Sequence, residues 1–122
     1  MKYTENDIKS SFPYIFLYQR SLEFGPGWND LVYDLCEKIM AIAKEKEIPL
    51  NEDFPFAVAQ IKEKFGGLRV YLTLTCDEID EVVDEAEELS YTICEVCGAP
   101  GKIYNDGWIE TLCEEHERKR DE

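Results

Sequence analysis

The sequence predicts an α+β protein in which a small antiparallel sheet, centred on one β-hairpin, is packed by two amphipathic helices and followed by a C-terminal zinc finger. Three observations support this fold class. Residues 29–47 and 77–93 place apolar side chains three and four positions apart, as helices with one buried face do. Residues 56–75 alternate in polarity around a Gly-Gly pair, which is typical of a hairpin. The last segment contains a CxxC and a CxxH motif, the ligand types and spacing of zinc sites.

The N-terminal segment is polar, and Thr4 and Asp7 are placed to cap a short helix. We expect Pro13 to end this helix. The apolar run at 14–18 is too short to decide between helix and strand. A proline flanked by glycines then predicts a turn at 24–28.

The first long helix is expected to begin with Asn29 as its N-cap and to extend to about Glu47. Its apolar stripe consists of Leu31, Val32, Leu35, Cys36, Ile39, Ile42 and Ala43. In the hairpin that follows, the tight turn is predicted at Gly66-Gly67, because both residues can adopt the positive φ that such turns need.

A second helix is expected to begin at Asp77 or Glu78 and to extend to about Ile93. Its apolar stripe consists of Ile79, Val82, Val83, Ala86, Leu89 and Ile93. The opposite face carries acidic residues and no basic one, which makes it a candidate surface for binding a partner. The residues predicted to bind that partner are Asp80, Glu81, Asp84, Glu85 and Glu88.

Four side chains near the C-terminus are predicted to bind Zn²⁺, namely Cys94, Cys97, Cys113 and His116. Each pair is separated by two residues, and the histidine is the only one in the chain. Four protein ligands fill the coordination sphere, which favours a structural over a catalytic ion. Gly98 suits the positive φ after a zinc knuckle. The alternative is two unrelated pairs of buried thiols with a surface histidine.

Between the two ligand pairs, the segments 102–104 and 108–111 flank an Asn-Asp-Gly turn, which predicts a second hairpin. A knuckle, a hairpin and a final helix that carries the last two ligands describe a treble-clef or ribbon-like finger. We therefore divide the chain into an α+β core, residues 1–93, and a zinc-finger lobe, residues 94–122, packed on it. The lobe is too small to bury a core of its own.

The composition limits the cellular setting and the partners. The 122 residues carry a formal charge of −14, which argues against direct binding to nucleic acid. A basic groove on another protein is a better match, although the acidity could serve solubility alone. No apolar stretch approaches the ~20 residues of a membrane span, and the first residues lack a signal-peptide core. Cys36 and Cys76 are expected to be reduced, buried thiols. These features predict a cytoplasmic protein.

One group of cations stands out in this acidic chain. It lies around the predicted Gly66-Gly67 turn, where exposed glycine amides and nearby cations could bind an anionic, nucleotide-type ligand. The residues predicted to bind that ligand are Lys62, Lys64, Gly66, Gly67, Arg69 and Tyr71. The alternative is that the cations only pair with the acidic helix that follows. A ligand-sequestering protein would favour a homo-oligomer with its pocket between subunits.

Several segments together resemble a set of small uncharacterised proteins of bacteria and their phages. They are Gly25-Pro-Gly-Trp28, Gln60-Ile-Lys-Glu-Lys-Phe-Gly-Gly-Leu-Arg-Val-Tyr71, Cys94-Glu-Val-Cys-Gly98 and Trp108 to Cys113. The resemblance covers roughly residues 20–116 and implies a phage or mobile-element protein of the host cytosol that counters host defence. It implies no catalytic residues.

The functional hypothesis is a non-enzymatic, zinc-containing protein that blocks a host protein, a defence or nucleic-acid-binding protein, through its acidic surface. The second hypothesis is the nucleotide-sequestering site described above. A small enzyme of unknown reaction comes third, because the only histidine is assigned to zinc and no other nucleophile has an evident base.

Overall fold

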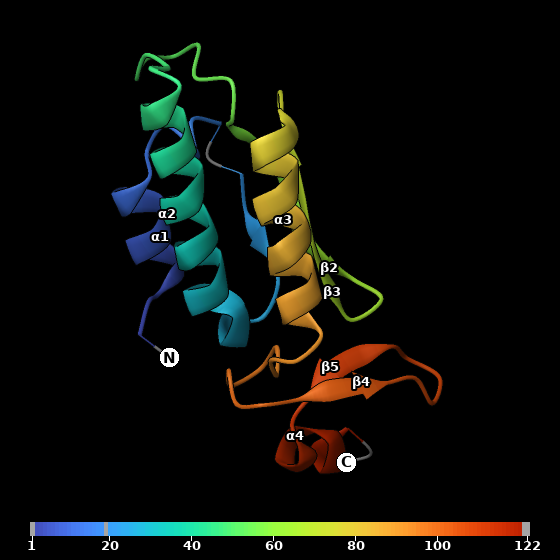
Figure 1. Cartoon of the computed structure of the whole chain (residues 1–122). Helices are drawn as coiled ribbons and strands as arrows, with labels where there is room; N and C mark the ends of the chain where they lie inside the picture. Colours follow the sequence, from blue (N-terminus) through green and yellow to red (C-terminus); the bar gives the residue numbers. More distant parts are fainter. Residues whose placement is uncertain (1, 19, 121–122) are drawn as a thin grey trace.

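A computed structural model describes residues 2–18 and 20–120 of the chain. It confirms the α+β class, with two small sheets and four α-helices among the described residues. The elements are, in chain order, α1 (Glu5–Ser11), β1 (Leu22–Glu23), the 3₁₀ turn η1 (Pro26–Trp28), α2 (Asn29–Glu45), β2 (Val58–Lys64), β3 (Gly67–Leu72), α3 (Asp77–Ser90), β4 (Lys102–Tyr104), β5 (Glu110–Leu112) and α4 (Glu114–Lys119). In Figure 1, α2 and α3 stand side by side, and β4, β5 and α4 form a lobe below them.

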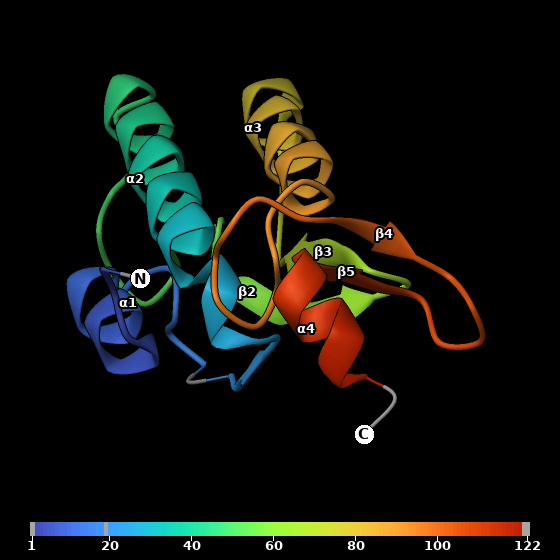
Figure 2. The same cartoon turned by 90° about the horizontal axis from the view of Figure 1, so that it is seen from below.

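The larger sheet has the order β1-β2-β3 and is mixed. Strands β2 and β3 are antiparallel, as predicted, but β1 pairs with β2 in parallel, which corrects the prediction of a purely antiparallel sheet. Parallel neighbours need a long crossover, and α2 lies within the segment that connects β1 to β2. The sheet has its helices on one side, where Figure 2 shows α2 and α3 above β2 and β3.

The core forms where this side of the sheet meets the helices. Ile61 of β2 and Leu68 of β3 are buried there, as are Ile39 of α2 and Ile79 of α3. The indole of Trp28 is also fully buried. The predicted apolar faces of the two helices are buried or half-buried except at Leu89 of α3, which remains 47% exposed. Ile93, predicted as the last residue of that stripe, lies beyond the end of α3 at Ser90.

The tight turn of the β2–β3 hairpin lies one residue earlier than predicted. Lys64 pairs with Gly67, so the two central residues of the turn are Phe65 and Gly66, with φ of 54° and 81°. Positive φ at both positions defines the type I′ turn that matches the twist of two strands. Gly67 instead begins β3. An aromatic residue therefore occupies a left-handed conformation that glycine or asparagine adopts at lower cost.

The N-terminal region follows the predicted capping but adds turns that the sequence did not indicate. Thr4 and Asp7 form the predicted capping box of α1 through reciprocal hydrogen bonds of 2.9 and 3.1 Å. The apolar run at 14–18 is a series of turns, neither helix nor strand. Trp28, not Asn29, is the N-cap of α2, and Asn29 is buried with its amide donating to the Tyr3 carbonyl at 3.0 Å.

Candidate metal centre

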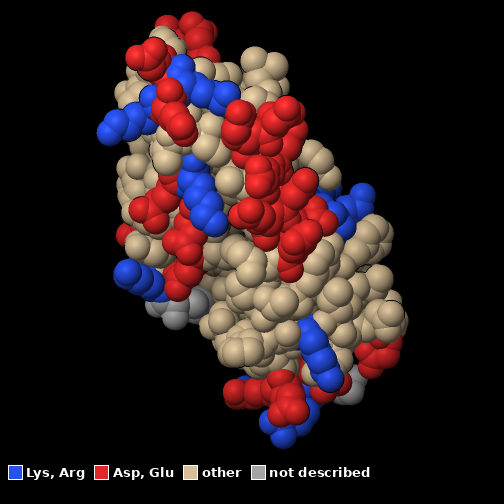
Figure 3. All heavy atoms as spheres, in the orientation of Figure 1, with Lys and Arg blue, Asp and Glu red and all other residues tan. Residues whose placement is uncertain are grey.

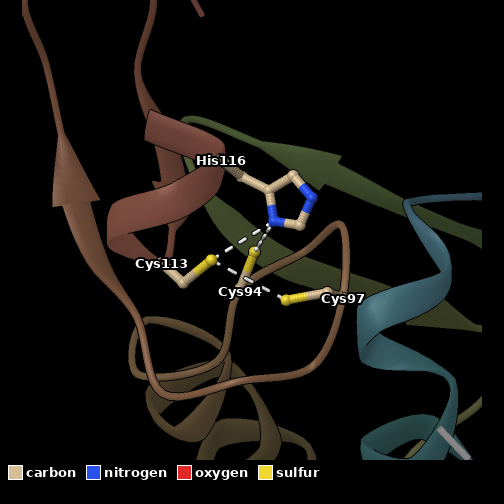
Figure 4. Close-up of side chains that lie close together, drawn as sticks. All are labelled: Cys94, Cys97, Cys113 and His116. Atoms are coloured by element: carbon tan, nitrogen blue, oxygen red, sulfur yellow. Dashed lines mark hydrogen bonds between the residues drawn. The ribbon is translucent and has the colours of Figure 1, made fainter. Parts of the chain in front are cut away.

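The four predicted metal ligands converge at one place in the C-terminal lobe. Their ligand atoms all lie within 4.8 Å of one another. Cys94 and Cys97 come from the loop before β4, and Cys113 and His116 from the start of α4, as Figure 4 shows. The Cys97 and Cys113 sulfurs are 3.7 Å apart, and Nδ1 of His116 lies 3.6 Å from Cys94 Sγ and 3.2 Å from Cys113 Sγ. The cluster is therefore close enough to hold a metal ion.

Local backbone structure brings each pair of ligands together. The first pair lies on a tight turn, in which the Gly98 N–H donates to the Cys94 carbonyl at 2.9 Å and Gly98 has the predicted positive φ of 83°. Cys113 is the N-cap residue of α4. Its carbonyl accepts from the Glu117 N–H at 2.9 Å, which winds the first helical turn and brings His116 back toward Cys113.

The groups around Cys113 favour its thiolate, which is the form in which a cysteine binds a metal. The backbone N–H of His116 donates to Cys113 Sγ and lowers the pKa of that thiol to about 6, so it is largely a thiolate at neutral pH. For Cys97 the largest influence is the Ala99 backbone N–H, which lowers the pKa. Burial and the hydrogen bonds of the Cys94 and Cys113 thiols outweigh it, and the pKa of Cys97 is raised overall. A bound cation would displace the proton of Cys97 by direct coordination.

The two remaining cysteines are free thiols, as predicted. Cys36 lies in the core, where burial raises the pKa of its thiol and keeps it protonated. Cys76 is only half-buried, at the N-cap position of α3, which corrects the prediction that both thiols are buried.

The Gly25-Pro-Gly-Trp28 segment attaches the ligand loop to the core. The Gly27 N–H donates to the Glu95 carbonyl at 2.7 Å, and the Gly25 N–H donates to Oε2 of Glu95 at 2.8 Å. The Trp28 indole N–H donates to the Ile93 carbonyl at 2.8 Å. A Cβ at Gly27 would lie 2.1 Å from the Cys94 carbonyl oxygen, so only glycine allows this approach. Sequence reasoning treated this segment as a turn and missed its contact with the ligand loop.

A second attachment joins the tip of the β2–β3 hairpin to β5. The hydroxyl of Thr111, which is fully buried, donates to the Gly66 carbonyl at 2.6 Å. A Cβ at Gly67 would lie 2.4 Å from the Tyr91 hydroxyl oxygen. Both glycines are buried, and the Gly66 N–H donates to the Glu63 carboxylate at 2.8 Å. The expectation that these glycines are exposed is therefore wrong, and the Gly66 amide is already hydrogen-bonded within the hairpin.

The structure brings the predicted cations together on one face of the hairpin. Lys62 and Arg69 are directly paired across β2 and β3, and Lys64 follows two residues after Lys62. Arg69, however, is committed to α3, since its guanidinium lies 2.7 Å from the Glu87 carboxylate. That contact is the alternative role that the sequence suggested for these cations. Tyr71 is 48% exposed on the same face.

The acidic residues of α3 gather into one patch, seen as the red area over α3 in Figure 3. Basic residues pair with members at its margins: Lys46 with Glu78 at 3.1 Å, and Lys38 with Glu85 at 3.9 Å. The acidic residues of α3 that form no salt bridge with any described residue are Asp77, Asp80, Glu81, Asp84 and Glu88. Of these, Asp80 accepts a hydrogen bond from the Thr75 hydroxyl at 2.5 Å.

Within residues 2–18 and 20–120, none of the helices has the length and apolar character needed to cross a bilayer. Comparison of the chain with protein-family models, with curated proteins and with solved structures finds no match in any of the three. The geometry of the molecule itself is therefore the basis for a functional assignment.

Proposed function

We propose that the cluster of Cys94, Cys97, Cys113 and His116 binds one Zn²⁺ ion and that this ion is structural. A tetrahedral ion with Zn–S of about 2.3 Å and Zn–N of about 2.0–2.1 Å requires S–S edges of about 3.8 Å and S–N edges of about 3.5 Å. The Cys97–Cys113 sulfur separation of 3.7 Å and the Cys94–His116 separation of 3.6 Å are close to these edges. The Cys113–His116 separation of 3.2 Å is shorter, and all four ligand atoms lie within 4.8 Å of one another. A disulfide would need its sulfurs at about 2.05 Å.

The order of ligand loop, β4–β5 hairpin and α4 supports a treble-clef type of finger. Three thiolates and an imidazole leave no protein-free position for a substrate or water, which supports a structural role. The zinc content of protein purified from cells tests this part of the proposal. One equivalent of zinc per chain in wild type, and its loss in Cys97→Ser, is the expected result. Protein that is folded and free of metal would contradict it.

We further propose that the protein is a non-enzymatic binding protein whose acidic α3 patch binds a positively charged surface of a partner protein. The observation that carries this proposal is the patch itself, which is contiguous and keeps five carboxylates outside any salt bridge with the described residues. Concentrated charge of one sign selects partners of the opposite sign and speeds their association. In the phage setting that the resemblance implies, the partner is a host defence or nucleic-acid-binding protein.

Charge reversal at three positions tests the patch. Asp84, Glu85 and Glu88 are exposed on α3, and replacing all three with Lys should abolish capture of the partner while the domain stays folded. The matched control reverses Glu37, Glu45 and Glu52, three exposed carboxylates outside α3, and should leave capture intact. Equal loss in both variants would show that only the net charge matters, and no loss in the α3 variant would refute the patch as the binding surface.

The nucleotide-sequestering hypothesis at Lys62, Lys64 and Arg69 receives less support from the geometry. The Arg69 guanidinium is already paired with Glu87, and the Gly66 amide with Glu63. An anion placed there would have to displace one of these carboxylates. Binding of a partner protein through the acidic α3 patch is therefore the function that the geometry supports best.

A further inference from the structure

The tips of the two hairpins lie together and expose large aromatic side chains. Phe65, in the β2–β3 turn, is 61% exposed, and Trp108, after the β4–β5 turn, is 73% exposed. They line one hollow of about 290 Å³ with Glu63, Lys64, Gly107 and Ile109. The two elements are held together by the bond from the Thr111 hydroxyl to the Gly66 carbonyl, so the two walls have a fixed relation.

Phe65 occupies its position against the local backbone preference. Its φ of 54° lies in the left-handed region, where a bulky side chain is disfavoured, and an Asn-Gly pair is the favoured sequence for a type I′ turn. Burial does not compensate this cost, because the ring is mostly exposed. The turn requires this φ but does not require an aromatic side chain there, and residues held in disfavoured conformations cluster at binding and active sites. The exposed ring is therefore better explained by a ligand than by stability.

Trp108 is also held in place. Arg120, at the end of α4, forms salt bridges with Asp106 at 3.1 Å and with Glu110 at 3.0 Å, and it donates to the Trp108 carbonyl. These contacts fasten both sides of the β4–β5 turn to the helix that carries His116. The indole is thus presented to solvent by a fixed backbone, as an anchor for a ligand requires.

The chemistry of the hollow indicates a planar ligand with negative charge. Two aromatic rings offer stacking faces. The Lys64 ammonium lies 5.6 Å from the centre of the Phe65 ring and forms no salt bridge with a described residue, which leaves it free to bind an anion. Oε2 of Glu63 binds the Gly66 N–H, so its other oxygen can accept from an amino group.

We propose that this hollow binds a free nucleotide, with the base stacked between Phe65 and Trp108 and the phosphate at Lys64. A volume of about 290 Å³ is at the lower limit of small-molecule sites, which start at about 300 Å³, and suits one nucleotide. The chain charge of −14 repels a polyanionic strand far more than a single nucleotide. This site differs in its residues from the acidic α3 patch, so either proposal can fail without the other.

Tryptophan fluorescence and calorimetry of the metal-loaded protein test the proposal. Trp108 is exposed and Trp28 is fully buried, so a stacked base should quench the long-wavelength part of the emission. We expect saturable quenching by adenosine 5′-monophosphate and none by ribose 5-phosphate, which lacks the base. Equal binding of ribose 5-phosphate, or tighter binding of a single-stranded oligonucleotide than of the mononucleotide, would overturn the proposal. The proposal would also be overturned if no nucleoside monophosphate bound saturably.

Variants locate the site by calorimetry. Trp108→Leu and Phe65→Asn should each weaken binding by about 5- to 150-fold, the range for loss of one stacked base. Lys64→Gln should weaken it by roughly 10-fold or more through loss of a charge-assisted bond. Tyr71→Ala is the control, because Tyr71 is also an exposed aromatic residue, on the cationic face of the hairpin, but does not line this hollow. A loss at Tyr71 equal to that at Trp108 would place the ligand on that face and overturn the proposal.

Phe65→Asn adds a readout that a structural role would not produce. Asparagine converts the turn to Asn-Gly and should raise the melting temperature while it weakens binding. A variant that loses stability together with binding would show that the ring supports the fold, and would contradict the argument from strain.

Discussion

Gly27 is the position at which a single added methyl group should separate the C-terminal lobe from the core. In Gly27→Ala, the new Cβ would lie 2.1 Å from the Cys94 carbonyl oxygen and 2.6 Å from both the Glu95 carbonyl carbon and the Gly98 nitrogen. Cβ atoms essentially never approach other heavy atoms within 3.0 Å, so the ligand loop has to move by roughly 1 Å. All three obstructing atoms belong to the backbone, which no side-chain rotation can clear.

The cost of this movement can be approximated from the contacts that it breaks. The Gly27 and Gly25 hydrogen bonds to Glu95 would be stretched, and each contributes about 0.5–1.5 kcal/mol. Overpacking of a tight contact adds about 1–3 kcal/mol. If both hydrogen bonds are lost, the free energy of unfolding should therefore fall by about 2–6 kcal/mol. The movement also displaces Cys94, so the metal should be lost more readily.

Denaturant unfolding and transfer of the metal to a chromogenic chelator measure the two effects. The control is Pro26→Ala, a change at the neighbouring exposed residue that should cost only about 0.4–1 kcal/mol through the unfolded chain. A Gly27→Ala protein with the unfolding midpoint and metal-transfer rate of wild type would refute the close approach between Gly27 and Cys94.

Three further outcomes are expected. Cys113→Ser should release the metal and unfold the C-terminal lobe, because metal binding and folding are coupled. The near-ultraviolet circular dichroism of Trp28 should also change, because its indole donates to the Ile93 carbonyl. An unchanged Trp28 signal would show that the core does not depend on the lobe. Thr111→Val should lower the free energy of unfolding by about 1–3 kcal/mol, because it leaves the buried Gly66 carbonyl without its hydrogen bond. The control Thr92→Val, at an exposed helix end, should lower it by less in the same denaturation assay. Alkylation at pH 8 should modify Cys76 in the native protein and Cys36 only after unfolding, since Cys36 is buried and its pKa is raised. Labelling of Cys36 in the native protein, detected by mass spectrometry of the digested protein, would contradict this expectation.

The features that the sequence predicted correctly depend on local patterns. The apolar stripes of α2 and α3 follow from helical periodicity, and the capping box of α1 from two residues three positions apart. The convergence of Cys94, Cys97, Cys113 and His116 could be predicted because the spacing of such motifs is set by the reach of two side chains around one ion.

The differences arise where distant residues decide the local structure. Glycine preference placed the hairpin turn at Gly66-Gly67, but the register that buries Ile61 and Leu68 pairs Lys64 with Gly67 and moves the turn to Phe65. Strand β1 has two residues, too few for any pattern to show. The contact of Gly27 with the ligand loop connects positions nearly seventy residues apart, and only the folded chain reveals it.

The attachment of Trp28 to the segment before the ligand loop has a consequence for how the chain folds as it is made. The indole partner, the Ile93 carbonyl, is 65 residues later in the chain, and the partner of Gly25 is 70 residues later. During synthesis, α2 can therefore form while the segment that precedes it still lacks its partner. Contacts between residues so far apart form slowly, and these contacts cannot form before the segment around Cys94 and Cys97 has been synthesised. With the proposed metal site, the nascent chain should remain sensitive to proteases until Cys113 and His116 have emerged, and metal supply at that moment should determine how much protein reaches the native state.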